Sequence, residues 1–205
     1  MKVERLPLGH IAANCYMIST ENSAVVVDCG TYSDFVYDFL DRNKDKERLI
    51  LLTHMHFDHI GGASKLREKT GVKIAVGEID APYLSDPEFN LSNRFHAHVE
   101  PFEADIKLTD GQEIKIGDIT VKAIKTSGHT KGGMCYLAED NLFSGDTLFF
   151  ETIGATDFEG GNMRELINSI KKLLELGDNI KVFPGHGEAT TIGHEKRYNM
   201  FLGNI

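Results

Sequence analysis

The sequence predicts an α/β fold of the αββα type, with two mixed sheets stacked together and helices on their outer faces. Apolar, β-branched runs such as AVVVDCG and RLILL are typical of strands buried on both faces. Segments with helical periodicity follow these runs, and the second half of the chain repeats the same style. No linker or repeat divides the 205 residues, so we expect a single domain over residues 1–205.

Short apolar or alternating segments bounded by turn-forming residues predict the strands. In the first half these segments are residues 2–8, 14–20, 23–28, 48–52 and 73–76. In the second half they are residues 113–116, 119–126, 134–138, 141–144 and 181–183. Gly117 and Asp118 are expected to form the turn of a hairpin between the first two of these later strands.

Apolar residues spaced by three or four positions predict the helices. The segments with this pattern, or with weaker helical signals, are residues 34–43, 62–70, 78–84, 163–176 and 194–202. Ser33 is a suitable N-cap for the first helix, which would place Phe35, Phe39 and Leu40 on one face. Gly71 is a suitable residue to end the second helix. Residues 85–110 have no clear period, and we interpret them as a mobile flap over a functional site.

The charge balance argues against nucleic-acid and membrane partners. The formal net charge is −9, and nucleic acids and anionic membranes both attract basic surfaces. The cysteines Cys15, Cys29 and Cys135 form no CxxC motif, and no signal peptide or long apolar run is evident. We therefore expect a cytoplasmic protein with reduced thiols.

The segment Thr53–His59 (THMHFDH) carries the strongest chemical signal. It places His54, His56, Asp58 and His59 within six positions, directly after a predicted strand. His54 and His56 are two residues apart, so both side chains would point to the same side of an extended segment. Asp58 and His59 fall where the chain turns into a helix. Such a density of imidazole and carboxylate groups indicates metal binding.

Three further residues of ligand type each follow a glycine just beyond a predicted strand. These residues are His129, Asp146 and His186. A glycine at that position allows the backbone to turn so that the next side chain faces a shared cleft. The recurrence of this pattern at three strand ends predicts that the remaining ligands come from there. Asp28, at the end of AVVVDCG, is either a turn residue or a group that orients a ligand histidine.

THMHFDH and the later segments SGHT, FSGD and PGHG resemble the motifs of the metallo-β-lactamase superfamily, in the same order. The resemblance covers nearly the whole chain and implies the αββα sandwich of that family. It also implies seven metal ligands: His54, His56 and His129 on one metal, Asp58, His59 and His186 on the second, and Asp146 bridging the two.

Within that superfamily, FSGDTLF, TDFEGGN and GHGEATTIGHEKRYNMFL resemble the short, single-domain hydrolases related to glyoxalase II. The resemblance implies a hydrolase that cleaves a hydroxyacyl-glutathione-like thioester, or a related ester, with hydroxide held by two divalent metal ions. Zn is favoured, with Fe or Mn as alternatives, and Asp58 would act as the catalytic group that orients the nucleophile. The expected partner is therefore a small-molecule thioester or ester.

Some features depart from the pattern of these hydrolases. Ala155 stands where an arginine is usual, Met200 where a proline is usual, and the chain ends soon after His186, without the glutathione-gripping helical domain of full-length glyoxalase II. A mononuclear iron dioxygenase acting on a persulfide, built on the same fold, is a competing interpretation. A lactonase, a phosphodiesterase, or a metal-dependent binding module without hydrolytic activity would also be compatible with these motifs.

Overall fold

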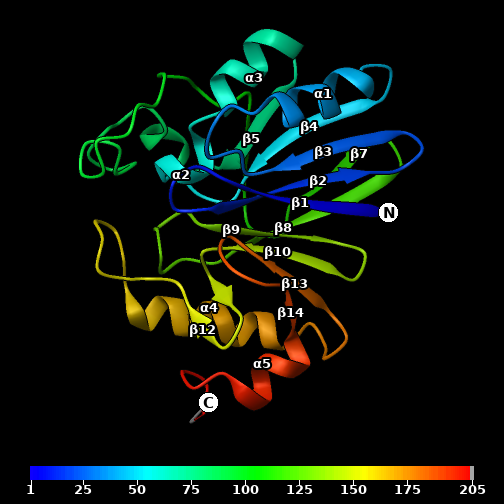
Figure 1. The fold of residues 1–205 in the computed structure, drawn as a ribbon. Coiled ribbons are helices and arrows are strands. Elements are labelled where there is room, and N and C mark those ends of the chain that lie inside the picture. The colour runs from blue at the N-terminus through cyan, green and yellow to red at the C-terminus, as the bar shows by residue number, and fades with distance from the viewer. Residues whose placement is uncertain (204–205) are drawn as a thin grey trace.

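The computed structural model describes residues 1–203, which form two mixed β-sheets with helices on their outer faces (Figure 1). This arrangement confirms the predicted α/β class with two mixed sheets and flanking helices. The first sheet has the order β1-β2-β3-β4-β5-β6 and the second the order β14-β13-β10-β9-β8-β7. A small antiparallel pair, β11-β12, forms a separate sheet that packs against the second one.

The first sheet changes from antiparallel to parallel pairing at its middle. Its strands are β1 (Lys2–Leu8), β2 (Ala13–Ser19), β3 (Ser23–Val27), β4 (Glu47–Leu52), β5 (Lys73–Gly77) and β6 (Ile106–Leu108). The pairs β1-β2 and β2-β3 are antiparallel, whereas β3-β4, β4-β5 and β5-β6 are parallel. The C-terminal ends of β3 and β4 therefore lie at the same edge of the sheet, which is where the residues of functional interest begin.

The second sheet is mostly antiparallel. Its strands are β7 (Glu113–Ile116), β8 (Ile119–Lys125), β9 (Met134–Ala138), β10 (Asn141–Gly145), β13 (Lys181–Pro184) and β14 (Thr190–Thr191). Only β10 and β13 pair in parallel. The predicted hairpin of β7 and β8 is confirmed, with Ile116 opposite Ile119 across the Gly117–Asp118 turn. The small pair consists of β11 (Leu148–Phe149) and β12 (Thr152–Ile153).

Helices α1 (Asp34–Arg42) and α3 (Ala63–Thr70) cover the first sheet, and α4 (Met163–Leu174) and α5 (Ile192–Tyr198) cover the second (Figure 1). The one-turn helix α2 (Phe57–Ile60) and the 3₁₀ turn η1 (Ala81–Tyr83) are short connections. The predicted caps of two helices are confirmed. The Ser33 hydroxyl accepts the N–H of Phe35, and Gly71 adopts the left-handed conformation at the end of α3.

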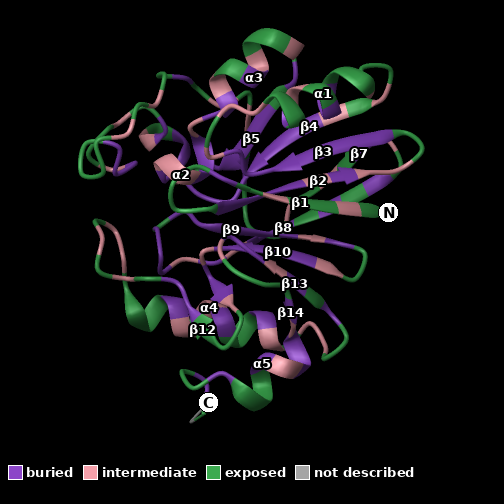
Figure 2. Cartoon of the chain, viewed as in Figure 1, coloured by how far each residue is buried: buried purple, intermediate pink, exposed green. Residues whose placement is uncertain are grey.

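Three apolar layers hold the sheets and helices together. Alternate residues of β3 face opposite ways: Val26 packs under the helices of the first sheet, whereas Val25 and Val27 pack between the sheets. Tyr136 and Phe143 supply fully buried aromatic rings to the layer between the sheets. A third layer lies between the second sheet and its helices. Figure 2 shows the strands buried through the middle of the molecule and the outward faces of the helices exposed.

Several predicted elements differ from the structure. The sequence places Phe35 on the face that packs against the sheet, but its side chain is 73% exposed. The buried face of α1 instead consists of Val36, Phe39 and Leu40, which follow the i, i+3, i+4 spacing of one helix face. The short helix predicted at residues 78–84 is reduced to η1, and the last helix begins two residues earlier and ends four residues earlier than its predicted range of 194–202.

The segment predicted as a structureless flap contains the edge strand β6, which pairs with β5. The rest of this segment is folded against the body of the protein. The Ser85 hydroxyl and the Phe102 backbone form reciprocal hydrogen bonds of 2.7 and 2.8 Å, and the Asn90 carbonyl accepts the N–H of Phe57 at 2.8 Å. Its predicted mobility remains a prediction.

No helix among residues 1–203 combines the length and apolar character that crossing a bilayer requires.

Candidate metal centre

The THMHFDH segment begins where β4 ends and turns into α2. Its first residues are fixed between the two sheets, because the Thr53 carbonyl accepts the N–H of Met134 at 2.8 Å. The Tyr136 hydroxyl donates to the Leu52 carbonyl at 2.7 Å, just before the segment starts. His54, His56 and His59 are all buried. The histidines thus project from a rigid strand end, which favours precise placement of ligands.

The other three candidates come from the second sheet. His129 follows β8, Asp146 follows β10 and His186 follows β13, each directly after a glycine. The structure brings all seven predicted side chains to one place between the ends of the two sheets, in three overlapping groups. These groups are His54, His56 and His129; His54, His59 and Asp146; and Asp58, His59 and His186. Within each group the potential ligand atoms lie within 4.8 Å of one another.

The separations between these atoms match those of metal ligands. His59 Nε2 lies 3.4 Å from Asp146 Oδ1 and 3.3 Å from Asp58 Oδ2. His186 Nε2 lies 3.1 Å from Asp58 Oδ2, while His129 Nε2 lies 3.5 Å from Asp146 Oδ2. Ligands about 2.0–2.2 Å from a tetrahedral metal stand roughly 3.3–3.6 Å apart. The cluster therefore has the dimensions of a metal site.

A further sign that the cluster suits cations comes from its buried polar atoms. Among residues 1–203, His54 Nε2, His56 Nε2, His59 Nε2 and Asp146 Oδ1 are buried without any hydrogen-bond partner. Leaving a polar atom unsatisfied in the interior costs about 1–3 kcal/mol. A divalent cation can accept lone pairs from all four of these atoms. Binding of such a cation would therefore satisfy them. The residues present thus fit a metal centre.

Hydrogen bonds on the far side of the rings orient the histidines. The Asp28 carboxylate accepts three bonds of 2.8 Å: from the Thr53 N–H, from the Thr53 hydroxyl and from His59 Nδ1. The Thr53 oxygen in turn lies 3.0 Å from His54 Nδ1. His129 Nδ1 lies 2.6 Å from the Ala155 carbonyl. Engagement of Nδ1 directs Nε2 of each ring into the cluster.

These contacts distinguish the two interpretations of Asp28. Asp28 contacts His59 directly and His54 through Thr53, so it is a positioning residue rather than only a turn residue. It also adopts a φ of +55°, a conformation that aspartate and asparagine tolerate better than most residues.

Asp80 is a positioning residue that the sequence motifs do not reveal. Its buried carboxylate accepts the Thr130 hydroxyl at 2.7 Å and the Gly132 N–H at 2.8 Å. Asp80 lies in the turn after β5, in the other sheet. It therefore connects that turn to the loop that carries His129. A single aspartate in a turn gives no sequence signal for such a contact, because its partners lie about fifty positions away in the chain.

Asn14, at the start of β2, holds the loop of His186. Its backbone N–H donates to the Gly185 carbonyl at 2.7 Å, and its side-chain amide donates to the Pro184 and Gly187 carbonyls at 2.9 and 3.0 Å. Gly185 itself leaves no room for a larger residue. A Cβ at this position would overlap Asp146 Oδ1 and lie 2.8 Å from His59 Cε1.

Burial and neighbouring charges set the protonation of the cluster. Burial lowers the pKa of His54 well below its usual value and that of His56 to about 3, so both rings are neutral, as ligands must be. Burial alone would also lower the pKa of His59, but the carboxylates of Asp58 and Asp146 outweigh it and raise that pKa well above its usual value. The same pairing holds the pKa of Asp58 well below its usual range, despite the opposing effect of burial.

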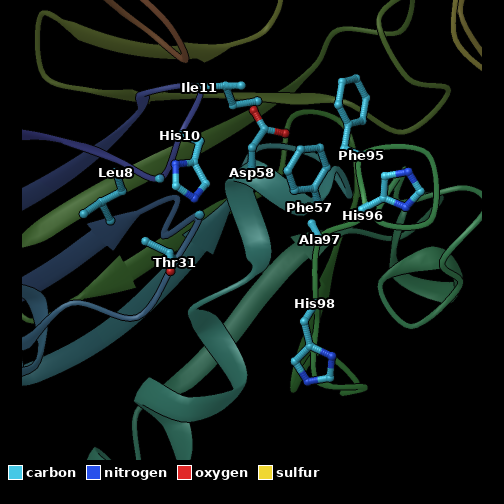
Figure 3. Close-up of a pocket in the computed structure, with 12 residues that line it drawn as sticks. Leu8, His10, Ile11, Thr31, Phe57, Asp58, Phe95, His96, Ala97 and His98 are labelled. Atoms are coloured by element: carbon cyan, nitrogen blue, oxygen red, sulfur yellow. The ribbon is translucent and has the colours of Figure 1, made fainter.

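A cleft of about 370 Å³ opens beside Asp58, as Figure 3 shows. The loop between β1 and β2 lines one side with His10 and Ile11, and residues 95–98 of the predicted flap line another. Neither His10 nor His96 belongs to the candidate ligand groups among residues 1–203. The cations that lie close to the motifs in the sequence do not line this cleft; they are Lys131, Arg164, Lys196 and Arg197.

The sequence matches a family model described as the metallo-β-lactamase superfamily over residues 8–186. The chain belongs to the metallo-β-lactamase superfamily. This finding confirms the predicted family, and the two-sheet architecture matches that of its solved members.

Curated relatives span the full length of the chain. An uncharacterized protein from Mycobacterium tuberculosis is 38% identical over 100% of this chain and 99% of its own length. The probable metallo-hydrolase YqgX from Bacillus subtilis is 34% identical, with the same coverage. The hydroxyacylglutathione hydrolase GloC from Haemophilus influenzae is 32% identical, again over 100% and 99% of the two chains.

Two solved structures share the whole fold. The crystal structure of BLEG-1 B3 metallo-beta-lactamase has a TM-score of 0.92 and 36% identity over 99% of this chain and 100% of that chain. The structure of TTHA1623 in a di-iron-bound form has a TM-score of 0.85 and 28% identity over 98% and 100% of the two chains.

Proposed function

We propose that this superfamily member is a metal-dependent hydrolase that holds two divalent ions and cleaves a small-molecule thioester or a related ester. The observation that carries the proposal is the convergence of seven imidazole and carboxylate side chains, four of whose buried atoms have no partner among residues 1–203. The cleft beside Asp58 supplies the access that a substrate needs. The names of the metallo-hydrolase and GloC relatives support a hydrolytic reaction.

The two outer groups would each hold one metal: His54, His56 and His129 the first, and Asp58, His59 and His186 the second. Asp146 would lie between them, because its two oxygens face His59 and His129 at 3.4 and 3.5 Å. Two bound divalent ions lower the pKa of a shared water and polarise the substrate carbonyl. Zn remains the favoured metal, with Fe or Mn as alternatives; the di-iron form of TTHA1623 supports keeping iron.

Asp58 is the ligand candidate that also lines the cleft. Its depressed pKa keeps the carboxylate ionised, so it can accept a hydrogen bond from the attacking water and orient it. Transfer of the water proton to Asp58 then depends on the acidity that the metal ions give to that water. A thiolate leaving group needs little protonation, so cleavage of a thioester does not require a separate acid. Thr31 is the hydroxyl-bearing residue of the cleft, and His10 and His96 supply imidazoles.

A mononuclear iron dioxygenase on the same fold is the main competing function. The group of Asp58, His59 and His186 favours two metals, because its ligand atoms are as closely spaced as those of the group of His54, His56 and His129. A lactonase or phosphodiesterase would use the same metals and differ only in the cleft. The likeness to BLEG-1 makes a β-lactam a further substrate worth testing.

The test combines elemental analysis of purified, metal-loaded protein with a panel of substrates. The panel contains S-lactoylglutathione, an uncharged thioester, a lactone, a phosphodiester and a β-lactam. We expect close to two metal ions per chain and hydrolysis of at least one thioester or ester. One iron per chain with oxygen uptake on a glutathione persulfide would replace the proposal with the dioxygenase. A loaded protein that cleaves nothing in the panel would refute it.

A further inference from the structure

We propose that the cleft beside Asp58 selects substrates by an uncharged, apolar body, such as an aryl group, rather than by the charged groups of glutathione. The inference rests on the proposed function for the identity of the bond that is cleaved. It concerns the walls of the cleft, which the candidate metal ligands do not form apart from Asp58.

Four large apolar side chains form part of the walls. Leu8 and Ile11 come from the end of β1 and the loop that follows it, and Phe57 and Phe95 stand opposite (Figure 3). The Phe57 and Phe95 rings stack at 5.1 Å between centroids. Figure 3 shows these two rings on one side of the Asp58 carboxylate and His10 and Ile11 on the other.

Two of these apolar side chains remain exposed to solvent at the edge of the cleft. Ile11 is 46% exposed and Phe95 is 45% exposed. Exposed apolar side chains gathered at a concave site mark a surface that buries them against a ligand. The aromatic surface also continues to the metal cluster. The centroid of the Phe158 ring lies 6.3 Å from the centroid of the Phe95 ring and 5.9 Å from that of the His56 ring.

Beyond Asp58, which would be a metal ligand, the walls of the cleft offer no lysine or arginine to an anionic substrate. Asp58 is the only carboxylate among the residues that line the cleft, and the basic side chains there are imidazoles. Carboxylates are usually held by arginine or lysine, often through paired hydrogen bonds. The guanidinium of Arg94 instead lies over the Phe158 ring, 4.9 Å from its centroid. Glutathione carries two carboxylates, which would meet no fixed cation in this cleft.

The polar groups of the cleft suit neutral partners. His10 and His96 are imidazoles that can donate or accept a hydrogen bond with a hydroxyl, amide or carbonyl group. His98 is engaged by Glu100 at 2.8 Å and lies away from Asp58 in Figure 3. The cleft volume of about 370 Å³ is at the small end of the range for small-molecule sites, which fits a single ring or a short alkyl chain.

Matched thioesters test the preference directly. S-phenylacetyl-N-acetylcysteamine and S-phenylacetylglutathione share the acyl group and the scissile bond. They differ in the thiol moiety, which carries charged groups only in the glutathione compound. We expect kcat/KM to be at least about tenfold higher for the uncharged compound. Replacing phenylacetyl by acetyl in the uncharged thioester should lower kcat/KM about tenfold or more, because a buried ring is lost.

Three variants of the metal-loaded protein assign the effect to the cleft. Phe95→Ala should raise KM for the phenylacetyl substrate about tenfold, with little change in metal content. Ile11→Lys places a cation at the mouth and should raise kcat/KM for the glutathione thioester. Phe35→Ala removes an equally large exposed ring on α1, outside the cleft. It should leave KM and kcat/KM unchanged for both substrates. Preference for the glutathione thioester, with no effect of Phe95→Ala, would overturn the inference while leaving the hydrolase intact.

Binding of non-hydrolysable analogues separates this inference from the proposed function. Calorimetry would compare S-benzyl-N-acetylcysteamine with S-benzylglutathione on the metal-loaded protein. Tighter binding of the uncharged thioether, weakened by Phe95→Ala and unchanged by Phe35→Ala, supports the cleft assignment even if the hydrolysis panel is negative. Equal binding by the wild type and Phe95→Ala would overturn the assignment even if hydrolysis is observed.

Discussion

Replacement of Asp28 by asparagine tests how far the candidate metal cluster depends on a residue that lies behind its histidines. Asparagine has nearly the same size as aspartate and tolerates the φ of +55°, so the backbone should be retained. The change removes one acceptor oxygen. The carboxylate now accepts three bonds of 2.8 Å from Thr53 and His59, whereas an amide has a single oxygen and presents an N–H₂ donor in place of the second.

The size of the effect follows from that lost acceptor. If the amide oxygen keeps the Thr53 N–H, the N–H₂ group faces the His59 Nδ1–H, and the ring loses its anchor. A hydrogen bond to a charged group contributes about 1.5–3 kcal/mol, and a change of about 1.4 kcal/mol alters an equilibrium constant tenfold. We therefore expect metal affinity to fall roughly 10–100-fold, the usual cost of losing a residue that orients a metal-binding histidine.

The assay is a competition titration against a chromophoric chelator, combined with elemental analysis after dialysis. Asp105→Asn is the matched control, because Asp105 accepts the Ile74 N–H at 2.8 Å and belongs to none of the ligand groups. Circular dichroism should show that both variants are folded. If Asp28→Asn binds metal within about threefold of the wild type, the orienting role assigned to Asp28 is wrong.

Three further predictions concern the same cluster. Asp146→Ala removes the residue between the two groups and should abolish both metal retention and turnover; elemental analysis with full occupancy would contradict the bridging role. Gly185→Ala introduces a Cβ that overlaps Asp146, and we expect at least about a tenfold loss of metal affinity with the fold retained, whereas Gly203→Ala, whose Cβ would make only an ordinary contact of 3.8 Å, should leave affinity unchanged. Asp80→Asn weakens the hold on the His129 loop, so Co(II)-substituted protein should lose the absorption of the first metal before that of the second. Simultaneous loss of both signals would show that Asp80 acts on overall folding instead.

The central strands could be predicted because their residues are apolar on both faces. In β3 and β4, β-branched and leucine side chains serve the layer between the sheets and the layer under the helices at once, which leaves a continuous apolar run in the sequence. Segments at the periphery have no such continuous apolar run in their sequence. β6 has three residues at the edge of a sheet, and α1 tolerates the exposed Phe35 because its buried face is already filled.

The candidate ligands were visible because histidine and aspartate next to glycine at strand ends are uncommon, and the structure brings all seven together. Their role as metal ligands stays a prediction. The positioning residues were less visible. Asp80 and Asn14 act through contacts with distant parts of the chain, and neither residue type is unusual in a turn or strand. The cleft was predicted in part: the segment 85–110 was placed over the site and supplies residues 95–98 of the wall, whereas the loop after β1 carries no motif that marks it as the opposite wall.

The origin of the ligands in both sheets has a consequence for the integrity of the chain. The first half contributes four of the seven candidates, from His54 to His59, and the second half contributes His129, Asp146 and His186. A cut in the connecting segment between η1 and β6 would leave two fragments, each with an incomplete coordination sphere. Such fragments would reassociate most tightly in the presence of the metal, so that coordination acts as a reversible cross-link across a nicked protein.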